Sequence, residues 1–172
     1  MKTVYCAMFV LVILFCDSAT TKEISMNGLK TEVEEVMPSG SITVRISNSS
    51  KDVIKLWKQS NGWGAACWRV LLIRNGRLET FFQNPDQAFT RNVPSFTEIV
   101  GGSHIELRLD LNGGNWCGFD HCTSFDQRGF NGKNLSFAPN DLVIVVYDVP
   151  YTVEATRLGV WYGFAATSTI VH

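Results

Sequence analysis

The chain has 172 residues, 15 of them Lys or Arg and 16 Asp or Glu, with a formal net charge of -1. A nearly neutral chain without a cluster of basic residues has no electrostatic footprint for nucleic acid or anionic lipid, so nucleic acid is excluded as a primary partner. The length fits one domain.

Residues 1–18 have the pattern of a secretory signal peptide. Lys2 is followed by an apolar run of about a dozen residues, and small residues stand at Ser18 and Ala19, where cleavage is expected. The run is shorter than the roughly 20 residues that span a bilayer, and no later apolar run is long enough. We therefore expect a secreted protein without a membrane span. A lipid anchor at Cys16 is the alternative, disfavoured because bulky residues precede that cysteine.

Residues 19–40 are predicted to form a polar leader or a short helix before the domain, which then comprises residues 41–172. Leu29, Val33 and Val36 recur at the spacing of an amphipathic helix, and a Pro-Ser-Gly sequence would end it. A disordered or later-removed segment fits the same residues.

After residue 40 the pattern changes to short alternating runs separated by turn residues, with almost no helical periodicity, which is typical of an all-β domain. Asn75-Gly76 between two apolar runs is the strongest hairpin signal, because both residues accept the positive φ of a type I′ turn. In chain order the main strand runs are residues 41–47, 53–57, 67–74, 77–82, 95–100, 103–111, 142–149 and the C-terminal run 156–172.

The last of these runs resemble the closing half of an immunoglobulin-like β-sandwich, in which a turn leads into a strand that carries a tyrosine, here Tyr147, and a final strand pairs beside it. The rhythm is also similar to that of small bacterial proteinase-inhibitor and cell-surface sandwich modules. The resemblance implies an antiparallel β-sandwich of about eight strands. The sequence departs from the antibody Cys-Trp-Cys pattern, because Cys67 directly precedes Trp68.

A second resemblance implies a different fold. Residues 125–137, with Phe125, Phe130 and Gly132, look like the first strand and fold-over of a βγ-crystallin Greek-key motif. Such a domain would be stabilised by Ca²⁺ on loop carbonyls and on a side chain such as Asp141. The motif occurs once, whereas crystallin-like domains normally carry two.

Three cysteines remain after removal of the signal peptide: Cys67, Cys117 and Cys122. Zinc would need a second Cys/His pair beside Cys117, His121 and Cys122, and the gap between the two cysteines departs from that of thioredoxin-like centres. We therefore expect no resident metal and no enzymatic cysteine. A local Cys117–Cys122 disulfide with a buried, free Cys67 is favoured, and a long-range bridge from Cys67 is the alternative.

The predicted binding surface combines two loop tryptophans, Trp63 and Trp116, each flanked by glycine. Such rings suit stacking on a sugar, a peptide or a partner protein, unless they fold back onto the sandwich. The polar residues expected to orient the ligand are Asn115, Asp120, His121 and Arg128. The favoured function is a secreted, non-enzymatic module that binds an extracellular protein or glycan. The alternatives are a calcium-stabilised crystallin-like structural protein and a secreted protease inhibitor.

Two N-glycosylation sequons start at Asn48 and Asn134 and agree with export. Oxygen-bearing side chains that could hold Ca²⁺ lie close together in sequence, although their spacing differs from that of an EF-hand and solvated turn residues fit them better. They are Asp110, Asn112, Asn115, Asp120 and Asp126.

Overall fold

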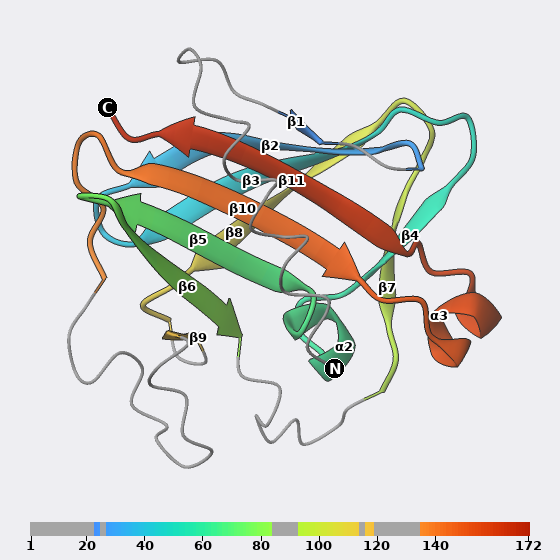
Figure 1. The fold of residues 1–172 in the computed structure, drawn as a ribbon. Coiled ribbons are helices and arrows are strands. Elements are labelled where there is room, and N and C mark those ends of the chain that lie inside the picture. Colours follow the sequence, from blue (N-terminus) through green and yellow to red (C-terminus); the bar gives the residue numbers. More distant parts are fainter. Residues whose placement is uncertain (1–22, 25–26, 84–92, 114–115, 119–134) are drawn as a thin grey trace.

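A computed structural model describes residues 23–24, 27–83, 93–113, 116–118 and 135–172. Within them the chain forms an antiparallel β-sandwich of two layers, which confirms the predicted fold class (Figure 1). The front layer is a six-stranded sheet, called here the large sheet. Its strands in spatial order are β1 (Glu23–Ile24), β11 (Gly163–Ile170), β10 (Leu142–Val149), β5 (Trp68–Arg74), β6 (Arg77–Gln83) and β9 (Trp116–Gly118).

The second layer consists of two separate pieces. The small sheet has the order β2 (Leu29–Met37), β3 (Ser41–Asn48) and β8 (His104–Asp110). The ribbon pairs β4 (Ile54–Trp57) with β7 (Phe96–Ile99). Two short helices, α2 (Gly62–Ala65) and α3 (Val153–Leu158), connect strands at one end of the sandwich (Figure 1). No helix in the described part of the chain is long and apolar enough to cross a membrane.

The core lies between the two layers and follows from alternation along the strands. In β3 the side chains of Ile42, Val44 and Ile46 are completely buried, and the residues between Ile42 and Ile46 on the other face are partly exposed. In β10 the inward residues include Val143 and Val145, which belong to the same hydrophobic cluster. Because each such side chain contributes roughly 1.5–3 kcal/mol when buried, this period of two determines which face of each strand turns inward.

Residues 29–37 form strand β2, so the prediction of a short helix is wrong there. A β-bulge interrupts the pairing of β2 with β3 between Val33 and Glu35. The bulge adds one residue to the strand and shifts the alternation, so that Leu29, Val33 and Val36 all contact the core. Leu29, Val33 and Val36 therefore have helix-like spacing although they lie on a strand, because the bulge interrupts the two-residue alternation once.

The Asn75-Gly76 hairpin is confirmed. Arg74 pairs with Arg77 across a two-residue turn, and the two turn residues have φ values of 51° and 72°. The adjacent placement of the last two strands is confirmed as well, because β10 and β11 pair along their whole length from Leu142↔Ile170 to Val149↔Gly163.

The prediction of strands on both sides of the Gly101-Gly102 turn is correct, but these strands do not pair with each other. β7 pairs with β4 in the ribbon, whereas β8 pairs with β3 in the small sheet. Asn48 joins the two pieces at this end, because its amide Nδ2 donates to the carbonyl oxygens of Asp52 at 2.6 Å and Ile99 at 2.9 Å.

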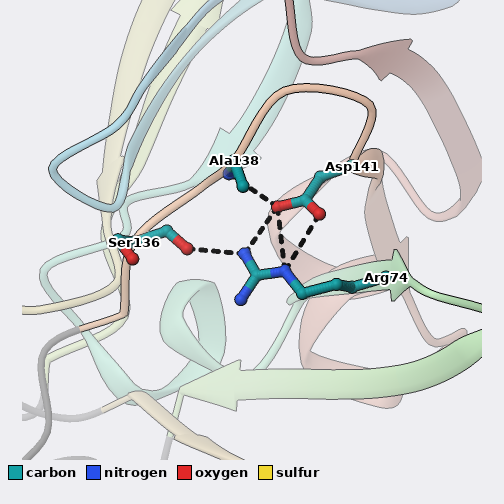
Figure 2. A network of polar contacts seen from close by, with 4 residues as sticks. All are labelled: Arg74, Ser136, Ala138 and Asp141. Carbon is teal, nitrogen blue, oxygen red and sulfur yellow. Dashed lines mark hydrogen bonds and ion pairs between the residues drawn. The ribbon is translucent and has the colours of Figure 1, made fainter.

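A charged contact fastens the chain before β10 to the large sheet (Figure 2). Both Arg74 Nε and Nη2 donate to the carboxylate of Asp141, with distances of 2.5–3.2 Å, and Nη2 also donates to the carbonyl of Ser136 at 2.6 Å. The backbone amide of Ala138 donates to Asp141 Oδ2 at 2.8 Å. The hydrogen bonds from Arg74 hold the pKa of Asp141 below its ordinary value of 3.8.

Replacing this carboxylate should destabilise the fold. Asp141→Asn keeps the shape of the side chain but removes the charge, and we expect a loss of about 1–3 kcal/mol in the free energy of unfolding at pH 7. Since the pKa of Asp141 is lowered in the folded state, its contribution is complete above pH 3.8 and disappears as the pH falls through the lower folded value. Urea unfolding at pH 7 and at pH 3 measures both effects.

Glu106→Gln is the matched control, because Glu106 is half-exposed and forms a single 3.5 Å ion pair with Arg45. It should change stability by less than about 0.5 kcal/mol. Equal effects of the two substitutions at pH 7 would contradict the role assigned to Asp141.

Candidate ligand-binding cleft

A cleft of about 500 Å³ lies at the end of the sandwich that carries α2 and α3. Its volume falls in the range of about 300–1,000 Å³ that small-molecule sites occupy. The residues that line it come from the end of β4, from α2, from the start of β5 and from the end of β10. They are Trp57, Gly62, Trp63, Ala66, Cys67, Arg69, Asp148, Pro150 and Thr152.

Helix α2 positions Trp63 over this cleft. The side chain of Asn61 caps the helix, since its Oδ1 accepts from the amide of Gly64 at 2.9 Å. The Nδ2 of Asn61 also donates to the carbonyl of Ser95 at 2.9 Å. Gly64 itself is buried against the backbone carbonyl of Lys58, where a Cβ atom would overlap with that oxygen. The turn therefore depends on both Asn61 and Gly64.

Trp63 is half-buried and stacks on Trp57, with ring centroids 5.8 Å apart and an interplanar angle of 27°. Trp57 is buried in the core at the end of β4. The indole of Trp63 thus rests on a rigid support and remains in part accessible from the cleft, as expected for a residue that stacks on a ligand.

Arg69 and Asp148 provide opposite charges on the cleft wall. Arg69 Nη1 lies 3.4 Å from Asp148 Oδ2, and the two side chains are 38% and 45% exposed. They are diagonal neighbours on adjacent strands, because Arg69 pairs with Val146 and Asp148 lies two residues further along β10. Side chains with this exposure keep donor and acceptor sites that a polar ligand can reach.

Cys67 lies at the base of the cleft as a buried, free thiol, as predicted. The thiol donates to the carbonyl oxygen of Trp63 at 3.0 Å. The pKa of Cys67 is raised to about 12, mainly by burial and to a smaller extent by the negative charge of Asp148, while Arg69 opposes the shift. The thiol is therefore protonated at neutral pH and a poor nucleophile.

An exposed aromatic pair lies next to the cleft on both sides of α3, and the sequence pattern did not reveal it. Tyr151 and Tyr162 are 70% and 44% exposed, and their rings meet edge to face at a centroid distance of 5.0 Å. Tyr151 lies between two lining residues, Pro150 and Thr152, and Thr152 caps α3 by accepting from the amide of Ala155. The sequence signal for this pair is Pro150 before Tyr151 and Gly163 after Tyr162.

Trp116 does not present an exposed ring, so its assignment to the binding surface is wrong. It begins β9, pairs with Gln83 of β6 and is only 2% exposed within the hydrophobic core. The alternative considered for it, a ring folded back onto the sandwich, is what the structure has. The polar residues predicted to orient the ligand lie outside the described residues; they are Asn115, Asp120, His121 and Arg128. Cys122 and Asn134 lie outside them as well.

The strand register nevertheless brings Trp63 and Cys117 to the same end of the molecule. Tyr147 pairs with Trp68, Arg69 with Phe82, and Phe82 with Cys117. The start of β5, which follows α2, is therefore separated from β9 by β6 alone (Figure 1).

Asn48 cannot carry a glycan in this structure, contrary to the expectation from its sequon. Its side chain is buried, with 1% exposure. Both amide protons are used by the carbonyls of Asp52 and Ile99, and its Oδ1 accepts from the amide and the hydroxyl of Ser50. A sugar on Nδ2 would displace these bonds and open the join between the small sheet and the ribbon.

Two of the candidate calcium ligands that the structure describes, Asp141 and Asn112, are occupied by other contacts, whereas Asp110 is exposed and its Oδ1 accepts from the amide of Asn112. Both oxygens of Asp141 bind Arg74. The amide of Asn112 clips the two ends of a long segment together, because its Nδ2 donates to the carbonyls of Ser39 and Leu135 and its Oδ1 accepts from the amide of Leu135. In the described ranges there is no group of three or more His, Cys, Asp or Glu side chains that could hold a metal ion.

Comparison of the chain with models of protein families, with curated proteins and with solved structures finds no match. The function is therefore inferred from the cleft itself.

A substitution at Gly64 tests the support of the cleft. In Gly64→Ala the added methyl group overlaps with the Lys58 carbonyl, and we expect a loss of about 1–3 kcal/mol in stability together with a displaced Trp63. Thermal unfolding and the tryptophan fluorescence of the folded protein measure the two effects. Gly118→Ala is the control, because its Cβ would meet nothing nearer than Phe81 at 3.9 Å. A Gly64→Ala protein as stable as the control would contradict this account.

Proposed function

We propose that this protein is a secreted, non-enzymatic binding module whose ligand is a saccharide held in the cleft beside α2. The observation that carries the proposal is the combination of a supported, partly exposed Trp63 with the Arg69–Asp148 pair on the same cleft wall. A sugar presents an apolar C–H face and a rim of hydroxyl groups, and the cleft offers a partner for each.

The chemistry of the pair favours hydroxyl groups over a charged ligand. A hydroxyl can accept from the guanidinium of Arg69 and donate to the carboxylate of Asp148 at once, so that neither residue loses a partner. A negatively charged ligand would be repelled by the carboxylate of Asp148, and a positively charged ligand would be repelled by the guanidinium of Arg69. Hydrogen bonds to ionised groups are stronger than those between neutral groups, which suits a ligand without charge.

The thiol of Cys67 supports binding over cysteine chemistry. A thiol with a pKa of about 12 gives almost no thiolate at neutral pH, and its hydrogen bond to the Trp63 carbonyl gives it a structural use. Tyr151, beside the cleft, offers a second exposed ring for a longer glycan. A protein-bound glycan therefore fits the same surface as a free sugar.

Binding should depend on Arg69. We expect at least one member of a panel of neutral mono- and disaccharides to give saturation-transfer NMR signals with the protein, and Arg69→Gln to weaken its binding about tenfold or more. The reason is the loss of a hydrogen bond from a charged donor, which is worth about 1.5–3 kcal/mol. Asp148→Asn tests the other half of the pair, and Trp63→Phe should reduce binding through a smaller stacking surface.

The matched control is Arg45→Gln. Arg45 is 36% exposed and forms ion pairs with Glu34 and Glu106 on the small sheet, away from the cleft. It should leave saccharide binding unchanged. Absence of binding by any saccharide, or equal binding by the Arg69→Gln and Arg45→Gln proteins, would contradict the proposal.

Export is part of the same proposal and is supported by the signal-like residues 1–18. In an oxidising compartment the cysteines that remain, Cys117 and Cys122, are expected to pair. Asn134 is the glycosylation site that we propose, since Asn48 is buried.

Peptide mapping of the unreduced protein, secreted by a eukaryotic host, tests these points together. We expect an N-terminus near Ser18 or Ala19, a peptide that contains Cys117 linked to Cys122, and an unmodified Asn48. Cys67 should react with an alkylating reagent only after denaturation, because burial keeps it protonated. Retention of residues 1–18 would overturn the proposed export, and a bridge to Cys67 would overturn the proposed Cys117–Cys122 pairing.

A further inference from the structure

A second cavity, of about 190 Å³, lies between the layers of the sandwich and is separate from the proposed saccharide site. It lies where the ribbon and the small sheet face the large sheet. The residues that line it are Leu56, Trp57, Lys58, Gln59, Ser60, Trp68, Thr97, Ile105, Leu107 and Tyr147. Of these, Trp57 is the one residue that also lines the cleft.

The cavity is lined from both sides of the seam between β8 and the ribbon. The two pieces are held together at one end by Asn48, whose side chain binds Asp52 and Ile99. Further along they are separate sheets in the described structure, and no ladder joins β8 to β4 or β7. Ile105 and Leu107 of β8, which face this gap, are only partly buried, and so is Thr97 on the ribbon side. The seam therefore gives a small molecule a route to the core.

The wall of the cavity is largely apolar and includes Tyr147, whose hydroxyl is buried. The O–H of Tyr147 has no hydrogen-bond acceptor, although the residue is only 1% exposed. Buried hydroxyl groups are normally paired, because an unmade hydrogen bond away from water is costly. The ring is held in place by Trp68 and Trp161, at centroid distances of 4.6 and 5.9 Å, so the hydroxyl cannot turn to solvent.

Burial keeps this hydroxyl neutral and therefore available as a donor. Burial raises the pKa of Tyr147 well above its ordinary value of 10, with a smaller contribution from Cys67. The backbone N–H of Trp57, directed at the hydroxyl oxygen, opposes the shift, and the O–H of Tyr147 itself has no acceptor.

We propose that this cavity binds a small apolar molecule, about the size of a single aromatic ring, that carries one hydrogen-bond acceptor for Tyr147. The size follows from the volume, because an apolar cavity of about 150 Å³ in a protein interior accommodates benzene. The ligand needs a hydrogen-bond acceptor because the O–H of Tyr147 is unpaired. The ligand should be uncharged because the buried residues that line the cavity are uncharged and Lys58, the one charged lining residue, is exposed.

A pair of probes of similar shape tests the proposal. Toluene and benzaldehyde have similar ring sizes, and only benzaldehyde carries a carbonyl acceptor. We expect both to shift the indole N–H signals of Trp57 and Trp68 in NMR titrations of the intact protein, with benzaldehyde bound more tightly. In Tyr147→Phe, which keeps the ring, benzaldehyde should bind about fivefold more weakly and toluene as well as before.

A second variant separates the cavity from the rest of the molecule. Leu107→Phe places a larger side chain at the partly exposed mouth and should weaken both probes about tenfold or more, with thermal unfolding used to verify the fold. Arg69→Gln, in the saccharide cleft, should change neither, so the two proposals succeed or fail separately. Failure of both probes to bind the wild-type protein, or an equal loss of toluene and benzaldehyde in Tyr147→Phe, would overturn the inference.

Discussion

The pairing of β5 with β10 is the contact on which both the fold and the cleft depend. Its register places Trp68 opposite Tyr147, so that both rings turn into the core and pack at 4.6 Å. The same register places Arg69 and Asp148 on the opposite face, where they form the charged part of the cleft wall. A slip of one residue would exchange the two faces, burying the charges and exposing the rings. Stability and binding are therefore specified by one alignment of two strands.

The sequence predicted local features well because those features have local causes. The Asn75-Gly76 turn needs two residues with positive φ, and the strands on both sides alternate as expected. The helix predicted for residues 29–37 is wrong because the bulge in β2 depends on the partner strand β3, and its one extra residue gives Leu29, Val33 and Val36 the spacing of a helix. The sequence could not predict that β7 pairs with β4 and β8 with β3, because long-range pairing leaves no local signal.

The site was half predictable. Trp63 and Trp116 have similar glycine-rich neighbours in sequence, yet Trp63 follows the Asn61 cap into a partly exposed turn and Trp116 enters a strand that pairs with β6. Exposure was decided by these tertiary contacts. The Arg69–Asp148 pair joins residues 79 positions apart and could not be recognised without the register. Asn48 was predicted to carry a glycan because a sequon depends on only three consecutive residues. Its burial depends on a distant residue, Ile99, whose carbonyl accepts from its side chain.

The hydrogen bonds of the Asn112 side chain also determine which part of the chain can change in length. They tie the chain at Ser39 and Asn112 to Leu135, and Arg74 holds Ser136 one residue further on. Because the entropy cost of closing a loop grows only slowly with its length, Leu135 can be held at the end of β8 at nearly the same free-energy cost whatever the number of residues between Gly118 and Leu135. Residues 116–118 are excluded from that freedom, because Trp116 is buried in the core and β9 pairs with β6.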